Sequence, residues 1–403
     1  MVKELYQIKE REVSLSINDG VVDSLRRKNI TKSGCRVYDG GFLGVAGTLG
    51  QPGEATWRQA EANLSRRLPC PWGPEMGKVR SARHGGTKTD EEFLAQTEQL
   101  LHTLRQDFPQ FTFSNKMNWM ELEIALRNDA GLDYTWRDAA ALISILVRAK
   151  DSIHIFDTAI GGVYRDFDPA VVLDEARRML EAHLNPLPMV DAEKMPVLAD
   201  PSLFSRAWEH GLHSRKLARG ASPWADSVGK KLFSADFTLT IDRTADHCMA
   251  PFFDGEGTTL EGDRIALIEN GILVRGLADK KCAWEHQAEK TASSGHGAYN
   301  DVPGLALEEL SAAHTGKTLD EILDGRPALY CMTSGGDVTP DGSFASPVQM
   351  AYLYQDGKLR GRLPEFAIRG NLQDILGDGY LGCSLDRPFD NQRQMVAEMT
   401  IVG

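Results

Sequence analysis

The sequence predicts an α+β protein, with an antiparallel sheet and helices in its first half and a β-rich domain in its second half. Three observations favour this class. Apolar and polar residues alternate with period two near the N-terminus, several later segments carry helical spacing, and beyond residue 200 short apolar runs alternate with Gly, Asp and Asn turns. The length of 403 residues is enough to bury more than one hydrophobic core.

The first elements are N-terminal hairpins. Residues 12–45 alternate in period two and reverse direction at two turn-forming sequences, NDG at 18–20 and DGG at 39–41. We therefore expect antiparallel strands on either side of each turn.

Helices are expected next. The segments 54–68, 89–108, 136–150 and 169–184 carry apolar residues at helical spacing, and acidic residues stand in the first turn of the first two. Acidic side chains favour the positive N-terminal end of a helix. The four segments are predicted to lie as helices on the N-terminal sheet.

A proline-rich stretch separates the two halves. Residues 185–201 contain NPLP and PVLADP, which cannot continue the preceding helix. We place the domain boundary there, with an N-terminal α+β domain over 1–195 and a β-rich C-terminal domain over 200–403. The second domain is expected to begin with one helix over 202–219. Its predicted strands contain the runs FTLTI, RIALIENGILVRGL, ALYCM, SFASPVQMAYLY and LYQDGKLRG.

Charge and cysteine usage exclude several classes of protein. The formal net charge of −12 disfavours binding to nucleic acids or to anionic membranes. The sequence has no run of 18 apolar residues and no apolar leader segment, so we expect a cytoplasmic protein. The six cysteines stand singly and without a CxxC pattern, which indicates free thiols in a reducing compartment.

One segment combines residues that can bind zinc. Glu209, His210 and His213 stand close together, and on a continuous helix the two histidines would share a face. Zinc would accept such a pair with a third ligand from elsewhere, but neither HExxH nor HxxEH is present. Nearby basic residues would oppose a bound cation: Arg206, Arg215, Lys216 and Arg219. Two interpretations stay open, namely surface or interface histidines and a pair of zinc ligands.

Three further segments are candidates for binding. The acidic Gly-rich sequence FDGEGT at 253–258 either holds a cation or clamps a peptide backbone, or it is a structural turn. The sequence SSGHG at 293–297 has the composition of an anion-binding nest, but no phosphate-binding motif accompanies it. Cys383 is either an exposed thiol or an inert small hydrophobic residue.

Several segments together resemble the TldD/PmbA family, whose paired members TldD and TldE are cytoplasmic peptidase subunits also called modulators of DNA gyrase. The opening VSLSINDGVVDSLRRKN…GCRVYDGGFLGVAGT is similar to the family's N-terminal hairpins. PFFDGEGTT, RIALIENGILVRGLADKKCA and SSGHG are similar to its central blocks, and GGDVTPDGSFASPVQMAYLYQDGKLRG with IRGNLQDIL is similar to its C-terminal strands. The blocks keep the family's order over most of the chain.

The resemblance also shows where this chain departs from the family. TldD-type subunits carry HExxxH followed by Gly-Leu on a helix, in which the two His bind zinc and the Glu is the general base; a Cys near the C-terminus resembles a third ligand. Here His210 takes the place of the second His, while Ser205 and Arg206 stand at the first His and the Glu. Serine is a poor zinc ligand and arginine cannot accept a proton. Cys383 would be the third-ligand counterpart, although the family's phrase around it is missing.

This departure is typical of the metal-free TldE (PmbA) branch. The resemblance thus implies a non-metal-binding, catalytically inactive subunit of a TldD/TldE-type zinc metallopeptidase that acts on unfolded or small peptides. It implies no cofactor in this chain, zinc in a TldD-like partner subunit, and a dimer with that partner or with a second copy. No nucleic acid or membrane partner is expected.

Two alternatives stay open. One is a stand-alone hydrolase with a relocated site at Glu209, His210 and His213, and the other is a non-catalytic homodimeric peptide-binding protein. The predicted substrate-binding residues are Glu209, His213, Glu256, Gly257, Thr258, Gly295 and His296, and the candidates for metal ligands are His210, His213 and Cys383.

Overall fold

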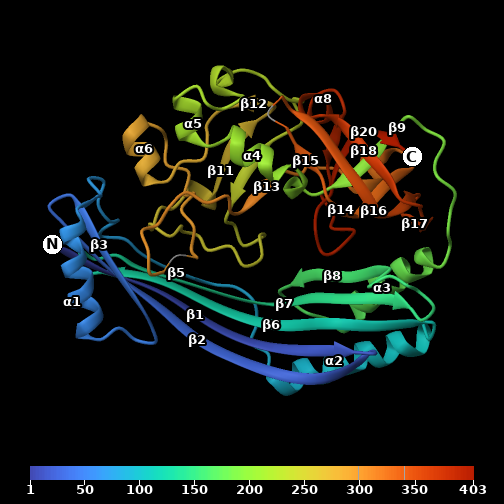
Figure 1. Cartoon of the computed structure of the whole chain (residues 1–403), viewed down its shortest axis with the longest axis horizontal. Helices are drawn as coiled ribbons and strands as arrows, with labels where there is room; N and C mark the ends of the chain where they lie inside the picture. The colour runs from blue at the N-terminus through green and yellow to red at the C-terminus, as the bar shows by residue number, and fades with distance from the viewer. Residues whose placement is uncertain (298, 340) are drawn as a thin grey trace.

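The protein folds around a long sheet that carries helices on one face and the C-terminal half of the chain on the other (Figure 1). It is described by a computed structural model that covers residues 1–297, 299–339 and 341–403. The predicted α+β class, with a β-rich second half, is confirmed.

The N-terminal half forms an eight-stranded sheet in the order β4-β3-β2-β1-β6-β7-β5, with β8 beside β7. Neighbouring strands are antiparallel except β5, which runs parallel to β7. The first three strands turn at 19–20 and 40–41, as the two predicted hairpins require. The strands are β1 (Val2–Asn18), β2 (Val21–Asp39), β3 (Phe42–Leu49), β4 (Leu68–Pro69), β5 (Val79–Arg83), β6 (Phe111–Asn128), β7 (Asp133–Ala149) and β8 (Thr158–Tyr164).

Helices cover the two ends of one face of this sheet. α1 (Glu54–Ala62), continued by a 3-10 turn at Asn63–Arg66, packs on β2 and β3. At the other end lie α2 (Asp90–Asp107) and α3 (Pro169–His183), which pack against each other (Figure 1). The predicted helices at 54–68, 89–108 and 169–184 are therefore present.

The helix predicted over 136–150 is wrong, because these residues form most of β7. The run AAALISILV is apolar at almost every position, so periodicity alone does not distinguish a buried strand from a helix. In the sheet Ile143, Ile145 and Val147 face the core under α2, while Leu142 faces the C-terminal half. Pairing of β7 with β6 along its whole length decides for the strand. The neighbouring strand β6 was not predicted from the sequence.

The C-terminal half contains two smaller sheets. One has the order β12-β11-β10-β13; the other, β14-β9-β20-β18-β16-β15, closes on itself because β14 also pairs with β16. β17 pairs with β16 and β19 with β20. The strands are β9 (Lys194–Ala199), β10 (Leu239–Asp242), β11 (Arg264–Glu269), β12 (Ile272–Leu273), β13 (Leu310–Ala312), β14 (Ala328–Ser334), β15 (Asp337–Val338), β16 (Ser343–Gln355), β17 (Lys358–Arg362), β18 (Phe366–Asn371), β19 (Tyr380–Cys383) and β20 (Met395–Val402).

Short helices connect these strands. They are α4 (Ser205–Gly211), α5 (Ser214–Ala218), α6 (Lys280–His286), α7 (Leu319–Leu323) and α8 (Leu372–Leu376), with 3-10 turns at Pro201–Phe204, Ala225–Ser227 and Glu261–Asp263. No helix in the described part of the chain is long and apolar enough to cross a membrane. All six cysteines carry free thiols.

The single helix predicted over 202–219 is also wrong, since the segment is a 3-10 turn followed by α4 and α5. The helical conformation is interrupted at His213. Its backbone is extended (φ −63°, ψ 112°), and its ring accepts a hydrogen bond from the backbone N–H of Arg215. The N–H of Ser214 donates instead to the carbonyl of Leu277. His210 and His213 consequently do not share one helix face.

Candidate functional site

Helix α4 is held in place by buried aromatic side chains. Trp208 is 0 % exposed, and its indole N–H donates to the carbonyl of Pro201 over 2.9 Å. Trp224 lies so close to Gly211 that a Cβ there would stand 2.1 Å from the indole ring. The buried residues of α4 therefore fix its inner face, and the remaining residues of the helix form its exposed outer face.

The outer face of α4 carries the residues that align with the zinc motif. Arg206 forms an ion pair with Asp337 of β15 over 2.5 Å, and both side chains are more than half exposed. His210 Nδ1 lies 2.9 Å from the Lys216 ammonium nitrogen. Since an ammonium group only donates, this ring nitrogen acts as the acceptor. Ser205 starts the helix on the exposed side.

A cavity of about 250 Å³ opens beside this face. Its lining is mainly apolar, with one ion pair at its mouth. It is lined by Arg206, Ala207, His210, Pro223, Trp224, Asp337, Val338, Thr339, Gly342, Leu372 and Gln373. A small apolar group fits such a space better than a metal ion does.

The donors around α4 do not fit zinc. His213 caps the N-terminus of the next helix, α5, where burial and the charges of Lys216 and Arg215 lower its pKa. Cys383 is buried elsewhere; its thiol donates to the carbonyl of Ala312, and burial raises its pKa to about 12. The thiol is thus protonated, whereas zinc binds the thiolate. In the described residues no three His, Cys, Asp or Glu side chains come together as a metal site.

The predicted substrate-binding residues fall into two groups. Glu209 is exposed and His213 half-buried, both near α4. The other five lie where the C-terminal half meets β1, β2 and β6, in a contact region that we call the seam and that comprises residues 252–258 and 291–296. These five are Glu256, Gly257, Thr258, Gly295 and His296. That either group binds a peptide stays a prediction.

The seam is built around the carboxylate of Asp254, which is 0 % exposed. It accepts hydrogen bonds from the backbone N–H groups of Glu256 (2.9 Å), Thr258 (2.8 Å) and Ser294 (3.1 Å). Burial raises the pKa of this carboxyl group. The charge of Arg243 and the three N–H groups act in the opposite direction but do not outweigh burial. The FDGEGT turn and the SSGHG sequence are therefore bonded to each other through one side chain.

Two buried arginines bind the carbonyls of the seam. Arg243, 2 % exposed, donates to the carbonyls of Pro251, Phe253 and Ala292 over 2.9–3.0 Å. Arg36 of β2, 1 % exposed, donates to the carbonyl of Gly255 over 2.6 Å. These contacts satisfy buried carbonyls of the seam, of which only that of Phe253 has a second donor among the described residues, the ring of His296.

His296 ties the C-terminal half to β1. Its Nε2 lies 2.7 Å from the carbonyl of Phe253, so this nitrogen carries the proton. The hydroxyl of Tyr6 donates its proton to the backbone carbonyl of His296 over 2.7 Å and also lies 2.9 Å from Nδ1 of the ring. Burial, with a contribution from Arg243, lowers the pKa of His296 to about 3, so the ring is neutral.

Among the titratable groups of the seam described above, Glu256 has the pKa nearest to neutral pH. Burial and the nearby carboxylate of Asp254 raise its pKa to about 8. Its Oε2 accepts from the backbone N–H of Lys280 over 2.9 Å. The Lys280 side chain, 4 % exposed, pairs with Glu75 over 3.0 Å. Burial opposes ionisation of Glu75, but Lys280 and its other basic neighbours outweigh it and lower its pKa to about 2.

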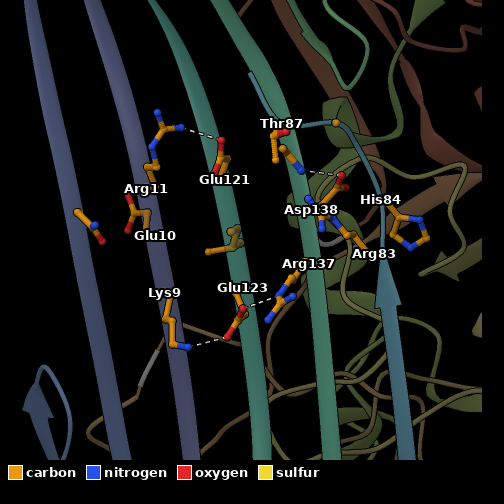
Figure 2. A pocket seen from close by; sticks show the side chains of 14 residues that line it. Lys9, Glu10, Arg11, Arg83, His84, Thr87, Glu121, Glu123, Arg137 and Asp138 are labelled. Atoms are coloured by element: carbon orange, nitrogen blue, oxygen red, sulfur yellow. Dashed lines mark hydrogen bonds and ion pairs between the residues drawn. The ribbon is translucent and has the colours of Figure 1, made fainter. Parts of the chain in front are cut away.

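A charged ladder occupies the helix-bearing face of the sheet between α1 and α2. Alternate residues of β1 point to this face, and Lys9 lies there between positions that pack on α1 and on α2. Figure 2 shows Lys9, Glu123 and Arg137 from three neighbouring strands joined in one row, with N···O distances of 2.8 and 2.5 Å. These charges are paired within the chain, which is typical of a solvated sheet face.

The buried arginines of the seam, Arg36 and Arg243, were not predicted from the sequence. Asp254 belongs to the predicted FDGEGT turn, but its bond to the SSGHG sequence was not predicted. The signal that could have found Arg36 is its place in CRVYD, where a charged residue interrupts an apolar strand. No local signal pairs Tyr6 with His296, which are 290 positions apart.

Residues 192–392 match the family described as the PmbA/TldA metallopeptidase C-terminal domain. Three curated relatives carry related names. A metalloprotease of Methanocaldococcus jannaschii is 27% identical over 210 residues, which is 49% of this chain and 46% of that protein. The metalloprotease TldD homologue of Buchnera aphidicola subsp. Acyrthosiphon pisum is 29% identical over 39% of this chain and 33% of its own length. The zinc metalloprotease TldD homologue of Saccharolobus solfataricus is 22% identical over 58% of this chain and 55% of its own. The chain thus spans about half or less of their length.

Solved structures of low identity share the whole fold. TldE from Thermococcus kodakarensis superposes with a TM-score of 0.80 at 18% identity, covering 100% of this chain and 97% of that chain. A protein from Thermotoga maritima described as a modulator of a DNA gyrase superposes with a TM-score of 0.77 at 16% identity, covering 100% and 96%. Both matches include the N-terminal sheet, which lies outside the matched family segment.

Proposed function

Because the chain belongs to the TldD/PmbA family, we propose that it is a TldE-like subunit of a TldD/TldE-type zinc metallopeptidase and holds no metal itself. Its partner is a TldD-like homologue that supplies zinc and the general base. The substrates are unfolded or small peptides, and the complex works in the cytoplasm.

The observation that carries this proposal is the outer face of α4. At the positions of the first His and the Glu, this chain has Ser205 and Arg206, and the guanidinium of Arg206 is already bound to Asp337. Lys216 adds a second positive charge beside His210. A zinc ion brought here would meet two cations, one imidazole ring and a carboxylate that is already paired with Arg206, which opposes binding.

The first test is elemental analysis of two proteins purified separately, the wild-type chain and its His210→Ala variant. We expect no stoichiometric zinc in either. About one zinc per chain, lost in the variant, would contradict the proposal and favour the stand-alone hydrolase with a relocated site.

The second test is co-expression with the homologue from the same genome that carries HExxxH. We expect the two chains to co-purify, zinc to be found in the partner, and unstructured peptides to be cleaved only by the pair. A partner that is fully active alone, or two chains that never associate, would refute the subunit role. Arg206→Glu, which reverses a charge on the exposed face of α4, is the informative variant, and Arg26→Glu on the exposed N-terminal sheet is its matched control.

We also propose that the two domains divide within 185–201, as 1–195 and 200–403. The support is that α3 ends at His183 and β9 begins at Lys194. Residues 185 and 187 are bonded to β17, and the carbonyl of Glu193 accepts a hydrogen bond from the N–H of Ile401 in β20, so the part without such bonds is 188–192. Limited proteolysis should cut there first, and a first cut inside a strand would contradict this boundary.

A further inference from the structure

A cavity of about 540 Å³ lies between the large sheet and the C-terminal half, apart from both α4 and the seam. Its volume is within the roughly 300–1,000 Å³ of typical ligand sites. The floor is apolar and comes from three neighbouring strands: Met120 and Leu122 of β6, Leu142 of β7 and Val163 of β8. All four side chains are half-buried.

The floor differs from the rest of the same sheet face. Farther along β6, Ile124 and Leu126 are almost fully buried under Phe252 and Phe253 of the seam. Leu122 packs against the edge of this cluster and is only half-buried, and the apolar side chains beyond it lie outside the cluster. The C-terminal half thus leaves an apolar strip of sheet open to an incoming group.

One wall of the cavity is the free edge of β13, formed by Leu310, Ser311 and Ala312. Among the described strands β13 pairs only with β10, and it is the last strand of its sheet. Hydrogen bonds from the N–H of Asp242 to the carbonyl of Glu309 and from the N–H of Ala313 to the carbonyl of Thr238 flank the strand.

These two bonds fix which backbone groups point outward. In an antiparallel ladder every second residue bonds to the partner strand, so Glu309, Ser311 and Ala313 face β10. The N–H and carbonyl of Leu310 and the N–H of Ala312 therefore point away from β10, on the cavity side of the strand. The carbonyl of Ala312 is already bound by the thiol of Cys383.

The rim of the cavity carries an excess of positive charge at one place. Arg387 and Arg393 both pair with Asp246, over 3.4 and 2.7 Å, so two guanidinium groups share one carboxylate. Of the other acids in the lining, Asp390 is largely buried and accepts from the hydroxyl of Tyr330. Asp200 caps the following turn through the N–H of Ser202. The Nδ1 atom of His247 lies 3.1 Å from a carboxylate oxygen of Glu309, so this ring already has an acidic partner.

We propose that this cavity binds an extended peptide segment with apolar side chains and a free carboxylate. The peptide main chain pairs with Leu310 and Ala312, its apolar side chains lie on Leu122 and Leu142, and its carboxylate meets Arg387 and Arg393. Pairing with the strand edge uses only the main-chain groups of a peptide and therefore does not depend on its sequence. The floor favours apolar side chains, and the two arginines of the rim favour a carboxylate. The inference rests on the proposed function only for peptides as the substrate class.

The test uses the purified full chain without any partner, so that it is independent of zinc and of cleavage. The probe is a fluorescein-labelled heptapeptide with valine at alternate positions and a free C-terminal carboxylate, measured by fluorescence anisotropy. We expect it to bind, its C-terminal amide to bind about tenfold more weakly, and a version with N-methylated backbone amides to lose binding.

Two variants locate the bound peptide. Leu142→Glu should abolish binding of both peptides, because it places a charge on the apolar floor. Arg393→Gln should reduce the affinity for the carboxylate peptide to that for the amide and leave the amide unchanged. Val171→Glu adds the same charge at a residue of α3 that is 48% exposed and is the matched control. Circular dichroism and thermal unfolding check that each variant is folded, and Arg387→Gln replaces Arg393→Gln if the latter is not.

The outcomes separate this inference from the proposed function. No binding by any probe, equal affinity for acid and amide, or binding that Leu142→Glu leaves intact would each overturn it. Peptide binding by the single chain together with a fully active solitary partner would refute the subunit role and leave the peptide site standing. Partner-dependent cleavage without binding in this assay would do the reverse.

Discussion

The outer face of α4 and the seam use arginine in opposite ways. Arg206 on α4 has a side chain that is 68% exposed and a single ion pair. Arg243 in the seam is 2% exposed and donates to three backbone carbonyls. Both lie in segments that resemble the same family. The comparison teaches that the seam uses its arginine to hold buried backbone in place, whereas α4 presents its arginine to solvent.

The largest expected effect is the removal of Arg243. Arg243→Met should lower the free energy of unfolding by about 3–5 kcal/mol, because it leaves three buried carbonyls and the Asp254 carboxylate without their cation. Urea denaturation measures the loss. Arg219→Met, at an exposed position near α5, is the control and should change stability little. A loss below about 1 kcal/mol for Arg243→Met would show that the seam is not held as described.

A smaller effect is expected from filling the close backbone contact in the seam. A Cβ on Gly255 would stand 2.2 Å from the carbonyl oxygen of Gly295, so Gly255→Ala forces the two segments apart. We expect a destabilisation of about 1–3 kcal/mol. Gly297→Ala meets no atom within 4 Å and serves as the control from the same SSGHG sequence. Equal thermal stability of the two variants would contradict the tight packing of this contact.

Four parts of the molecule show how far the structure could be predicted from the sequence. The hairpins at 18–20 and 39–41 were predictable because turn residues and strand periodicity are local signals. The strand β7 was not, because a run that is apolar on both faces satisfies either period. His213 was assigned to the helix of His210, because no local signal shows that Ser214 bonds to Leu277 and not within a helix. The two segments of the seam were singled out, but their contacts with β1 and β2 were missed because these contacts join residues hundreds of positions apart.

The third prediction concerns the pH dependence of the seam. The pKa of Glu256 is raised from 4.5 to about 8, so between these values the folded chain keeps a proton that the unfolded chain releases. Stability therefore falls as the pH rises through this window. His296, with its pKa lowered from 6.5 to about 3, has the opposite slope, but only below pH 6.5.

The measurement therefore compares the wild type with Glu256→Gln between pH 6.5 and 8. The wild type should lose about 1–2 kcal/mol more than the variant over this range. Gln keeps an oxygen for the backbone N–H of Lys280, so the fold is retained. Parallel stability curves for the two proteins would mean that Glu256 titrates normally and that the seam is open to water.

The smallest effect is expected on α4, where the comparison began. Arg206→Gln should change the free energy of unfolding by less than about 0.5 kcal/mol, because an ion pair between two exposed side chains is screened by water and salt. Urea denaturation of the variant and of Asp337→Asn, its matched partner variant, measures this directly. A loss as large as that of Arg243→Met would make Arg206 a structural residue and would remove α4 as a free surface. If stability is unchanged while Arg206→Glu weakens co-purification with the HExxxH-bearing homologue, α4 is a contact surface of the complex and its exposed basic side chain belongs to the subunit interface.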